Sequence, residues 1–128
     1  MNDKMTGASN AATRPMSDEP KPNPHPNASE KKQIKVFYGE LYETVEALFF
    51  RHDPIGINFE DNTDKYSPEV STVLPRLRSC SSVDDVQRVL HEEFTRWFGD
   101  AGPPEQYTPI AAELWPLWND FQSKVRNA

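Results

Sequence analysis

Apolar side chains recur every three or four positions along most of the chain after residue 28, a spacing typical of helices that share a core. The longest such stretch predicts a first helix from Glu30 to Phe50, with Ser29 as its N-cap. Gly39 lies inside this stretch, where a glycine costs about 1 kcal/mol relative to alanine. The apolar stripe consists of Ile34, Phe37, Leu41, Val45 and Leu48.

Two shorter helices are predicted by their terminal residues. Pro68 suits the first helical position, and the apolar spacing that follows it continues to about Arg78. Because Pro75 lacks an amide hydrogen, this helix should kink or break there. Ser82 is the expected N-cap of a third helix, which Gly99 ends.

A last helix is predicted from Pro109, or from Pro104 with a bend, to about Lys124, and Pro116 should distort it. No alternating strand pattern competes with these helices. The chain is therefore predicted to be all-α, a small bundle of about four helices.

Residues 1–28 have a different composition, with no large aliphatic or aromatic residue besides three methionines. Such a segment has too little apolar surface to offset its conformational entropy, so we expect a disordered, proline-rich N-terminal tail. The folded helical domain should then cover residues 29–128. The prolines of the tail are Pro15, Pro20, Pro22, Pro24 and Pro26.

The formal net charge is −6 at pH 7, and because the charges of the tail balance, it falls on the predicted helical domain. This negative net charge argues against nucleic-acid binding, which needs clustered lysine and arginine. It is compatible with an acidic face that binds a basic protein partner. No apolar run is long enough to span a membrane and no secretory signal is evident, so the expected location is cytoplasmic.

The turn-rich segment between the first two predicted helices has unusually specific chemistry. Pro54 forces Asp53 out of a helical conformation, so the first helix should end at about Arg51 or His52. Gly56 is free to take a positive φ angle. The segment is interpreted either as a structural connection between helices or as a functional loop, and its acidic continuation, residues 60–64, is the part most typical of a binding surface.

The string Asp53-Pro54-Ile55-Gly56, followed by Asp64-Lys65-Tyr66-Ser67-Pro68-Glu69-Val70, resembles the signature of the YugE-like family of small helical bacterial proteins of unknown function. The resemblance covers roughly residues 52–98 and extends more loosely from Ser29 onward. It implies a compact all-α bacterial domain whose two motifs join a first amphipathic helix to a second. It carries over no catalytic residues, and the long N-terminal tail departs from the family.

No catalytic or metal-binding constellation is evident, and we expect no cofactor. Cys80 is the only cysteine, which excludes an intrachain disulfide and a zinc site built from several thiolates. His91 and Glu92 begin like a zinc-protease motif, but Thr95 stands where the second histidine belongs. The acidic segment fits a calcium loop poorly, because Thr63 replaces the required glycine.

The preferred hypothesis is a binding module without catalysis, and its most specific form is an immunity-type inhibitor of a basic bacterial toxin domain. Small size, acidity, the family resemblance and the lack of a catalytic constellation support it. An acidic face would steer association, and aromatic side chains would anchor it. The predicted contact residues are Asp53, Glu60, Asp61, Asp64 and Tyr66.

Two other hypotheses stay open. A small enzyme or ligand-binding protein could use a pocket at the Asp53–Phe59 loop, with His52 as base and with His52, Asp53 and a carboxylate such as Glu69 converging in one cleft. The third is a homodimer that pairs through an exposed face bearing Trp115 or Trp118.

Overall fold

The computed structural model describes residues 19–56 and 66–127, and every regular element in these ranges is helical, which confirms the all-α prediction. Five α-helices and two 3₁₀ turns follow one another along the described chain. Their bounds are α1 Ala28–Tyr38, α2 Glu40–His52, α3 Ser67–Val73, η3 Leu74–Ser79, α4 Val83–Phe98, η4 Pro104–Tyr107 and α5 Thr108–Asn127.

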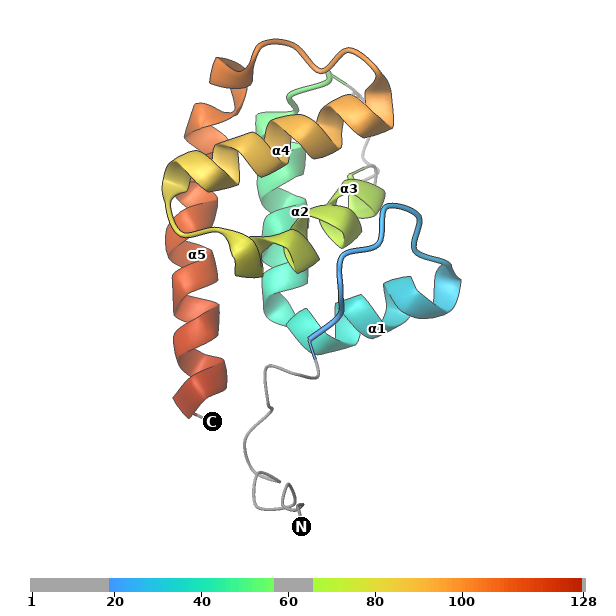
Figure 1. Cartoon of the computed structure of the whole chain (residues 1–128), viewed down its shortest axis with the longest axis vertical. Helices are drawn as coiled ribbons and strands as arrows, with labels where there is room; N and C mark the ends of the chain where they lie inside the picture. Colours follow the sequence, from blue (N-terminus) through green and yellow to red (C-terminus); the bar gives the residue numbers. More distant parts are fainter. Residues whose placement is uncertain (1–18, 57–65, 128) are drawn as a thin grey trace.

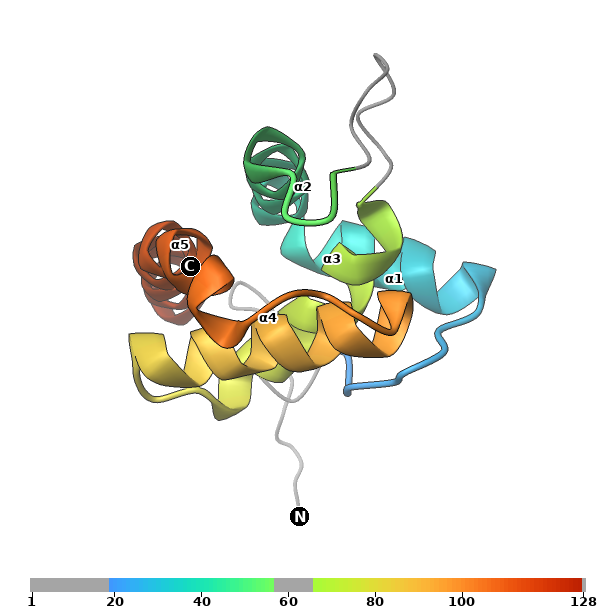
Figure 2. The ribbon, with the colours of Figure 1, turned by 90° about the horizontal axis from the view of Figure 1, so that it is seen from above.

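The helices form a bundle in which α2 and α5 run side by side and α4 crosses them (Figure 1). Seen from above, α2 and α5 are nearly end-on, while α4 runs across the view (Figure 2). The short helix α3 packs on both α2 and α4, so it fills the centre of the bundle. The last turns of α5 extend past the start of α2 (Figure 1).

The first predicted helix is in fact two helices that meet at Gly39. This residue has φ 56° and ψ −124°, a backbone conformation that side chains disfavour, and its amide donates to the carbonyl of Lys35. The prediction of one continuous helix from Glu30 was wrong because the apolar spacing continues across the break. The N-cap is Asn27 instead of Ser29, and its side chain and that of Glu30 form a reciprocal capping box.

The other predicted helix boundaries are mostly confirmed. The helix α3 gives way to a 3₁₀ turn that contains Pro75, as the missing amide hydrogen requires. Ser82 caps α4 by accepting a hydrogen bond from the amide of Asp85, and Gly99 ends the helix with φ 83°. The last helix begins at Thr108 after the η4 turn and continues through Pro116.

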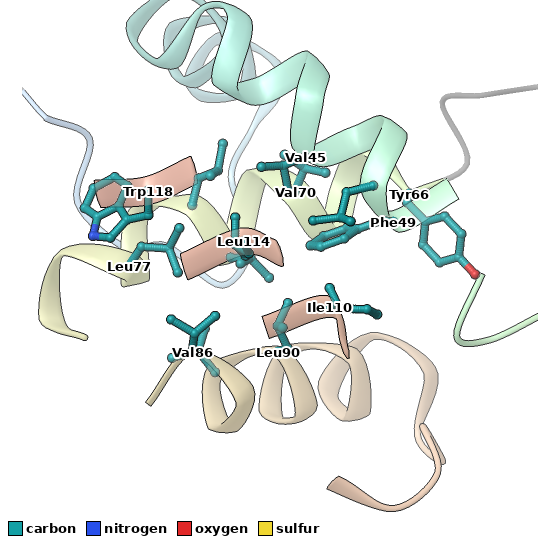
Figure 3. Packing of buried hydrophobic residues seen from close by; sticks show 14 of the residues in the cluster. Val45, Phe49, Tyr66, Val70, Leu77, Val86, Leu90, Ile110, Leu114 and Trp118 are labelled. Atoms are coloured by element: carbon teal, nitrogen blue, oxygen red, sulfur yellow. The ribbon is translucent and has the colours of Figure 1, made fainter. Parts of the chain in front are cut away.

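The core lies between all of these elements and is apolar and aromatic (Figure 3). All seven elements contribute to it, including Ile34, Phe37 and Tyr38 of α1 and Tyr107 of η4. Trp118 is fully buried and Trp115 is half-buried, so the predicted self-pairing face cannot include Trp118. The labelled core residues in Figure 3 are Val45, Phe49, Tyr66, Val70, Leu77, Val86, Leu90, Ile110, Leu114 and Trp118.

The segment 19–27, predicted as part of the disordered tail, packs on the helical domain. The carboxylate of Glu19 is buried and accepts a 2.8 Å hydrogen bond from the Tyr38 hydroxyl. Arg96 donates to the carbonyl of Pro24 (2.9 Å), and Pro26 is buried. Composition alone does not predict this packing, because few apolar side chains take part and the segment is held largely by hydrogen bonds of Glu19 and Pro24. The predicted boundary at residue 28 is therefore too late for the described part of the chain.

Candidate functional site

The Asp-Pro turn begins directly at the end of α2. Asp53 is the C-cap and has a left-handed conformation (φ 48°, ψ 56°), with its amide donating to the carbonyl of Phe49 (2.8 Å). Aspartate tolerates this conformation better than most residues. Gly56 has φ 76°, and its amide donates to the Asp53 carbonyl (3.1 Å). The predicted end of the helix and the positive φ of the glycine are both confirmed.

Tyr66 closes this turn from the far side of the loop. Its hydroxyl donates to the Asp53 carboxylate (2.7 Å) and accepts from the amide of Ile55 (3.2 Å). Its ring is 0% exposed and packs edge-on against Phe49, with 6.4 Å between the ring centroids. Gln106 also donates to the carbonyl of Pro54. We call Asp53, Pro54, Ile55 and Tyr66 the clasp, because they join the end of α2 to the start of α3.

The clasp changes the interpretation of two predicted contact residues. Tyr66 has no exposed surface to offer a partner, because its ring is part of the core. Asp53 is half-buried and accepts the Tyr66 hydrogen bond, so its carboxylate already has a structural role. The other three predicted contacts, Glu60, Asp61 and Asp64, lie outside the residues that the structure describes.

His52 belongs to a charged cluster that joins α2 to α5. Its Nε2 lies 2.6 Å from Oε2 of Glu113, and the Arg51 guanidinium donates to Oε1 of the same carboxylate at 2.7 Å. The hydrogen bonds from Arg51 and His52 lower the pKa of Glu113 to about 2. His52 therefore contacts a carboxylate of α5 and not Glu69 of α3.

Glu69 is the most unusual ionisable residue near the clasp. Its side chain is only 3% exposed, and among the described residues its Oε1 has no hydrogen-bond partner. Burial raises its pKa to about 7, and the charges of Lys31 on α1 and Arg96 on α4 offset only part of that effect. The contacts of His52, Asp53 and Glu69 therefore contradict the prediction that the three residues converge in one cleft. Each of the three has different neighbours.

A groove lies elsewhere, between the start of α2 and the last turns of α5. It has a volume of about 490 Å³, within the range of about 300–1,000 Å³ typical of ligand sites. The residues of α5 that line it follow a helical stripe over two turns. Its lining residues are Tyr38, Glu40, Leu41, Thr44, Leu117, Asp120, Phe121, Lys124 and Val125.

This groove was not predicted, although the apolar stripe that forms one side of it can be recognised in the sequence. The stripe of α5 continues to Phe121 and Val125, beyond the residues that the core needs to cover α2. Whether such a stripe is covered depends on where the neighbouring helix begins. The break at Gly39 determines that position, and the sequence did not predict it.

Within the described ranges 19–56 and 66–127, no group of three or more histidine, cysteine, aspartate or glutamate side chains could hold a metal ion. Burial raises the pKa of the Cys80 thiol, which disfavours the nucleophilic thiolate. None of the helices in the same ranges is long and apolar enough to cross a membrane.

Comparison with known proteins adds no relative. No family model matches the chain, and neither a curated protein nor a solved structure is similar to it at a significant level.

Proposed function

We propose that this protein acts by binding another protein and not by catalysis, and that its partner presents a basic surface. The observation that carries this proposal is that the candidate active-site residues do not converge: Asp53 contacts Tyr66, His52 contacts Glu113 of α5, and Glu69 is buried. A general base must lie beside its substrate, and none of these three residues lines the groove between α2 and α5. Here the ionisable groups at the turn hold helices together.

The charge distribution supports a basic partner. In the described part of the chain, Glu40 and Glu43 on α2 make no hydrogen bond or ion pair, whereas several arginines are paired with carboxylates. Lys21, Lys31 and Lys32 also form no ion pair within the described residues, but the whole chain carries 20 acidic against 14 basic residues, so the net charge presented to a partner is negative. Complementary charge raises association rates and favours one partner over others.

The resemblance of the two clasp motifs to the YugE-like family makes a bacterial origin part of this proposal. Its most specific form is an immunity-type inhibitor that covers a basic toxin domain. Glu60, Asp61 and Asp64 continue the chain from the clasp and are the proposed contacts. Tyr66 and Asp53 are assigned to the clasp instead.

Affinity capture from the native host tests this proposal. The full chain is immobilised, and a basic protein should be retained from the lysate. The double substitution Asp61→Lys and Asp64→Lys should weaken capture by about tenfold or more, since it converts two attractive contacts into repulsive ones. The control carries Asp84→Lys and Glu105→Lys, which change the net charge equally on the exposed surface of α4 and η4.

Equal capture by the wild type and the Asp61/Asp64 variant would remove this acidic segment from the contact surface. If the purified chain chemically modifies a small molecule, and the substitution His52→Ala abolishes that activity, the enzyme hypothesis is favoured instead.

A further inference from the structure

We infer that the groove between α2 and α5 is the docking site for an amphipathic, lysine- or arginine-rich helix of the protein partner. This inference rests on the proposed function and adds to it the surface and the kind of segment recognised. We call this surface the α2/α5 groove, defined by the lining residues given above.

The floor of the α2/α5 groove is apolar. Tyr38 at the end of α1 and Leu41 on α2 form one side, and Leu117, Phe121 and Val125 form its α5 side. Leu117 and Phe121 are only partly buried, although they pack against the core cluster. Apolar side chains from a partner would complete their burial, at a gain of about 25 cal/mol per Å² of surface removed from water.

The length of the groove fits a helix. Its α5 wall extends from Leu117 to Val125, which corresponds to about 12 Å at 1.5 Å per residue. A docked helix places its anchor side chains at positions i, i+3 or i+4, and i+7, over a span of about 10 Å. Two turns of apolar wall therefore match two turns of a partner helix.

The walls also disfavour an extended peptide. Both walls are α-helices, so they offer no continuous row of unpaired backbone groups, and at the groove only the first amides of α2 and the last carbonyls of α5 lack intrahelical partners. An extended segment would lose the hydration of its own amide and carbonyl groups without gaining partners. A helix satisfies these groups internally, so it can enter the groove at a lower cost.

The rim of the groove selects a cationic helix. Glu40 is exposed and has no hydrogen-bond or ion-pair partner within the described residues. Asp120 is paired with Lys124 at 3.1 Å, but both side chains are well exposed. An exposed pair of this kind contributes about 1 kcal/mol or less, so a partner cation can replace Lys124 easily.

Two model peptides test the inference with the full chain in solution. Each has about 18 residues, enough for five turns, with leucines at i, i+3, i+4 and i+7. One carries lysine and the other glutamate at the remaining positions. Calorimetric titration should detect binding of the lysine peptide and none of the glutamate peptide.

Matched variants then locate the binding. Glu40→Lys should weaken binding of the lysine peptide by about fivefold or more, while Glu43→Lys should change it by less than about twofold. Both glutamates are exposed, unpaired within the described residues, and lie in the first turn of α2, but only Glu40 lines the groove. Leu117→Ala should weaken binding through the apolar floor, with circular dichroism as the check that the variant folds.

The inference is overturned if neither peptide binds, if both bind equally, or if Glu40→Lys and Glu43→Lys have the same effect. It is also overturned if sedimentation shows a dimer that Leu117→Ala dissociates, because a second copy would then occupy the groove. Failure here leaves the proposed function standing if capture of the host partner still depends on Asp61 and Asp64.

Discussion

Glu69 is a carboxylate in a helical core, and at the scale of single residues it has a measurable consequence. Its pKa is raised by burial from 4.5 to about 7. Between these two pH values the unfolded chain releases the proton while the folded chain keeps it. The free energy of unfolding should therefore fall as pH rises from 4.5 to 7, by about 3 kcal/mol at 1.4 kcal/mol per pKa unit, and stay level above that.

The substitution Glu69→Gln removes this titration. Urea unfolding at several pH values should show a flatter profile between pH 4.5 and 7 for the variant than for the wild type. Glu105→Gln, on the exposed surface of η4, serves as the control. Identical profiles for Glu69→Gln and the wild type would show that the carboxylate does not titrate as its burial requires.

Single residues also show how far sequence reasoning reaches. The turn chemistry of Asp53, Pro54 and Gly56 is local, so their conformations could be predicted from residue types. Tyr66 could not be assigned in the same way. A tyrosine suits both an interface and a core, and only the packing of α2, α3 and α4 decides that its ring is buried and its hydroxyl faces Asp53.

The junction of α1 and α2 carries the clearest prediction at the scale of elements. Gly39 has φ 56°, and apart from the adjacent backbone no atom of the described residues lies within 4 Å of where a Cβ would be, so a substitution there meets conformational strain alone. Gly39→Ala should destabilise the fold by about 1–2 kcal/mol. In a continuous helix the same change would stabilise it by about 1 kcal/mol, so the sign distinguishes the two.

Thermal unfolding of the Gly39→Ala variant measures that sign. Thr44→Ala, an exposed change inside α2, controls for helix propensity. A higher melting temperature for Gly39→Ala would contradict the break between the helices and, with it, the position of the α2/α5 groove.

Elements could be predicted where proline and capping residues carry a local signal. Pro75, Ser82 and Gly99 mark boundaries that the structure confirms. Gly39 carries the same local signal as Gly99, but the apolar stripe continues through it and hides the boundary. Sequence periodicity reports which face is buried, but not whether the helix axis turns.

At the scale of the whole molecule, contacts of Arg51 and His52 with Glu113 join α2 to α5. Hydrogen bonds from Arg51 and His52 lower the pKa of Glu113 from 4.5 to about 2, so the contact stabilises the folded state above pH 4.5. That stability should be lost as pH falls from 4.5 toward 2, because protonation removes the charge. Glu113→Gln should lower the melting temperature at pH 6 and leave it nearly unchanged at pH 2, in a calorimetric pH series.

Long-range partners explain why the candidate site was only partly predictable. His52 and Glu113 are 61 positions apart, and Arg96 meets Pro24 at a separation of 72. Residue types alone indicated that His52 lay at a helix end and that the surface was acidic. Residue types alone could not indicate which carboxylate would contact His52. They also could not indicate that α5 extends past the start of α2, which leaves the α2/α5 groove.

The clasp joins α2 to α3, and we propose that partner binding belongs to the acidic segment 60–64 that follows it in the sequence and to the α2/α5 groove. Partner affinity and melting temperature, measured together for Tyr66→Phe and for the double variant Asp61→Lys with Asp64→Lys, distinguish the structural role from the binding role. The Tyr66→Phe change removes the hydrogen bonds that the Tyr66 hydroxyl makes with the Asp53 carboxylate and the Ile55 amide. It should therefore lower the free energy of unfolding by about 1–3 kcal/mol. Its partner affinity should be unchanged.

The double lysine variant should show the reverse, with an unchanged melting temperature and an affinity reduced by about tenfold or more. A Tyr66→Phe protein that keeps its melting temperature but no longer binds the partner would show that Tyr66 contacts the partner and that the clasp is itself a binding surface.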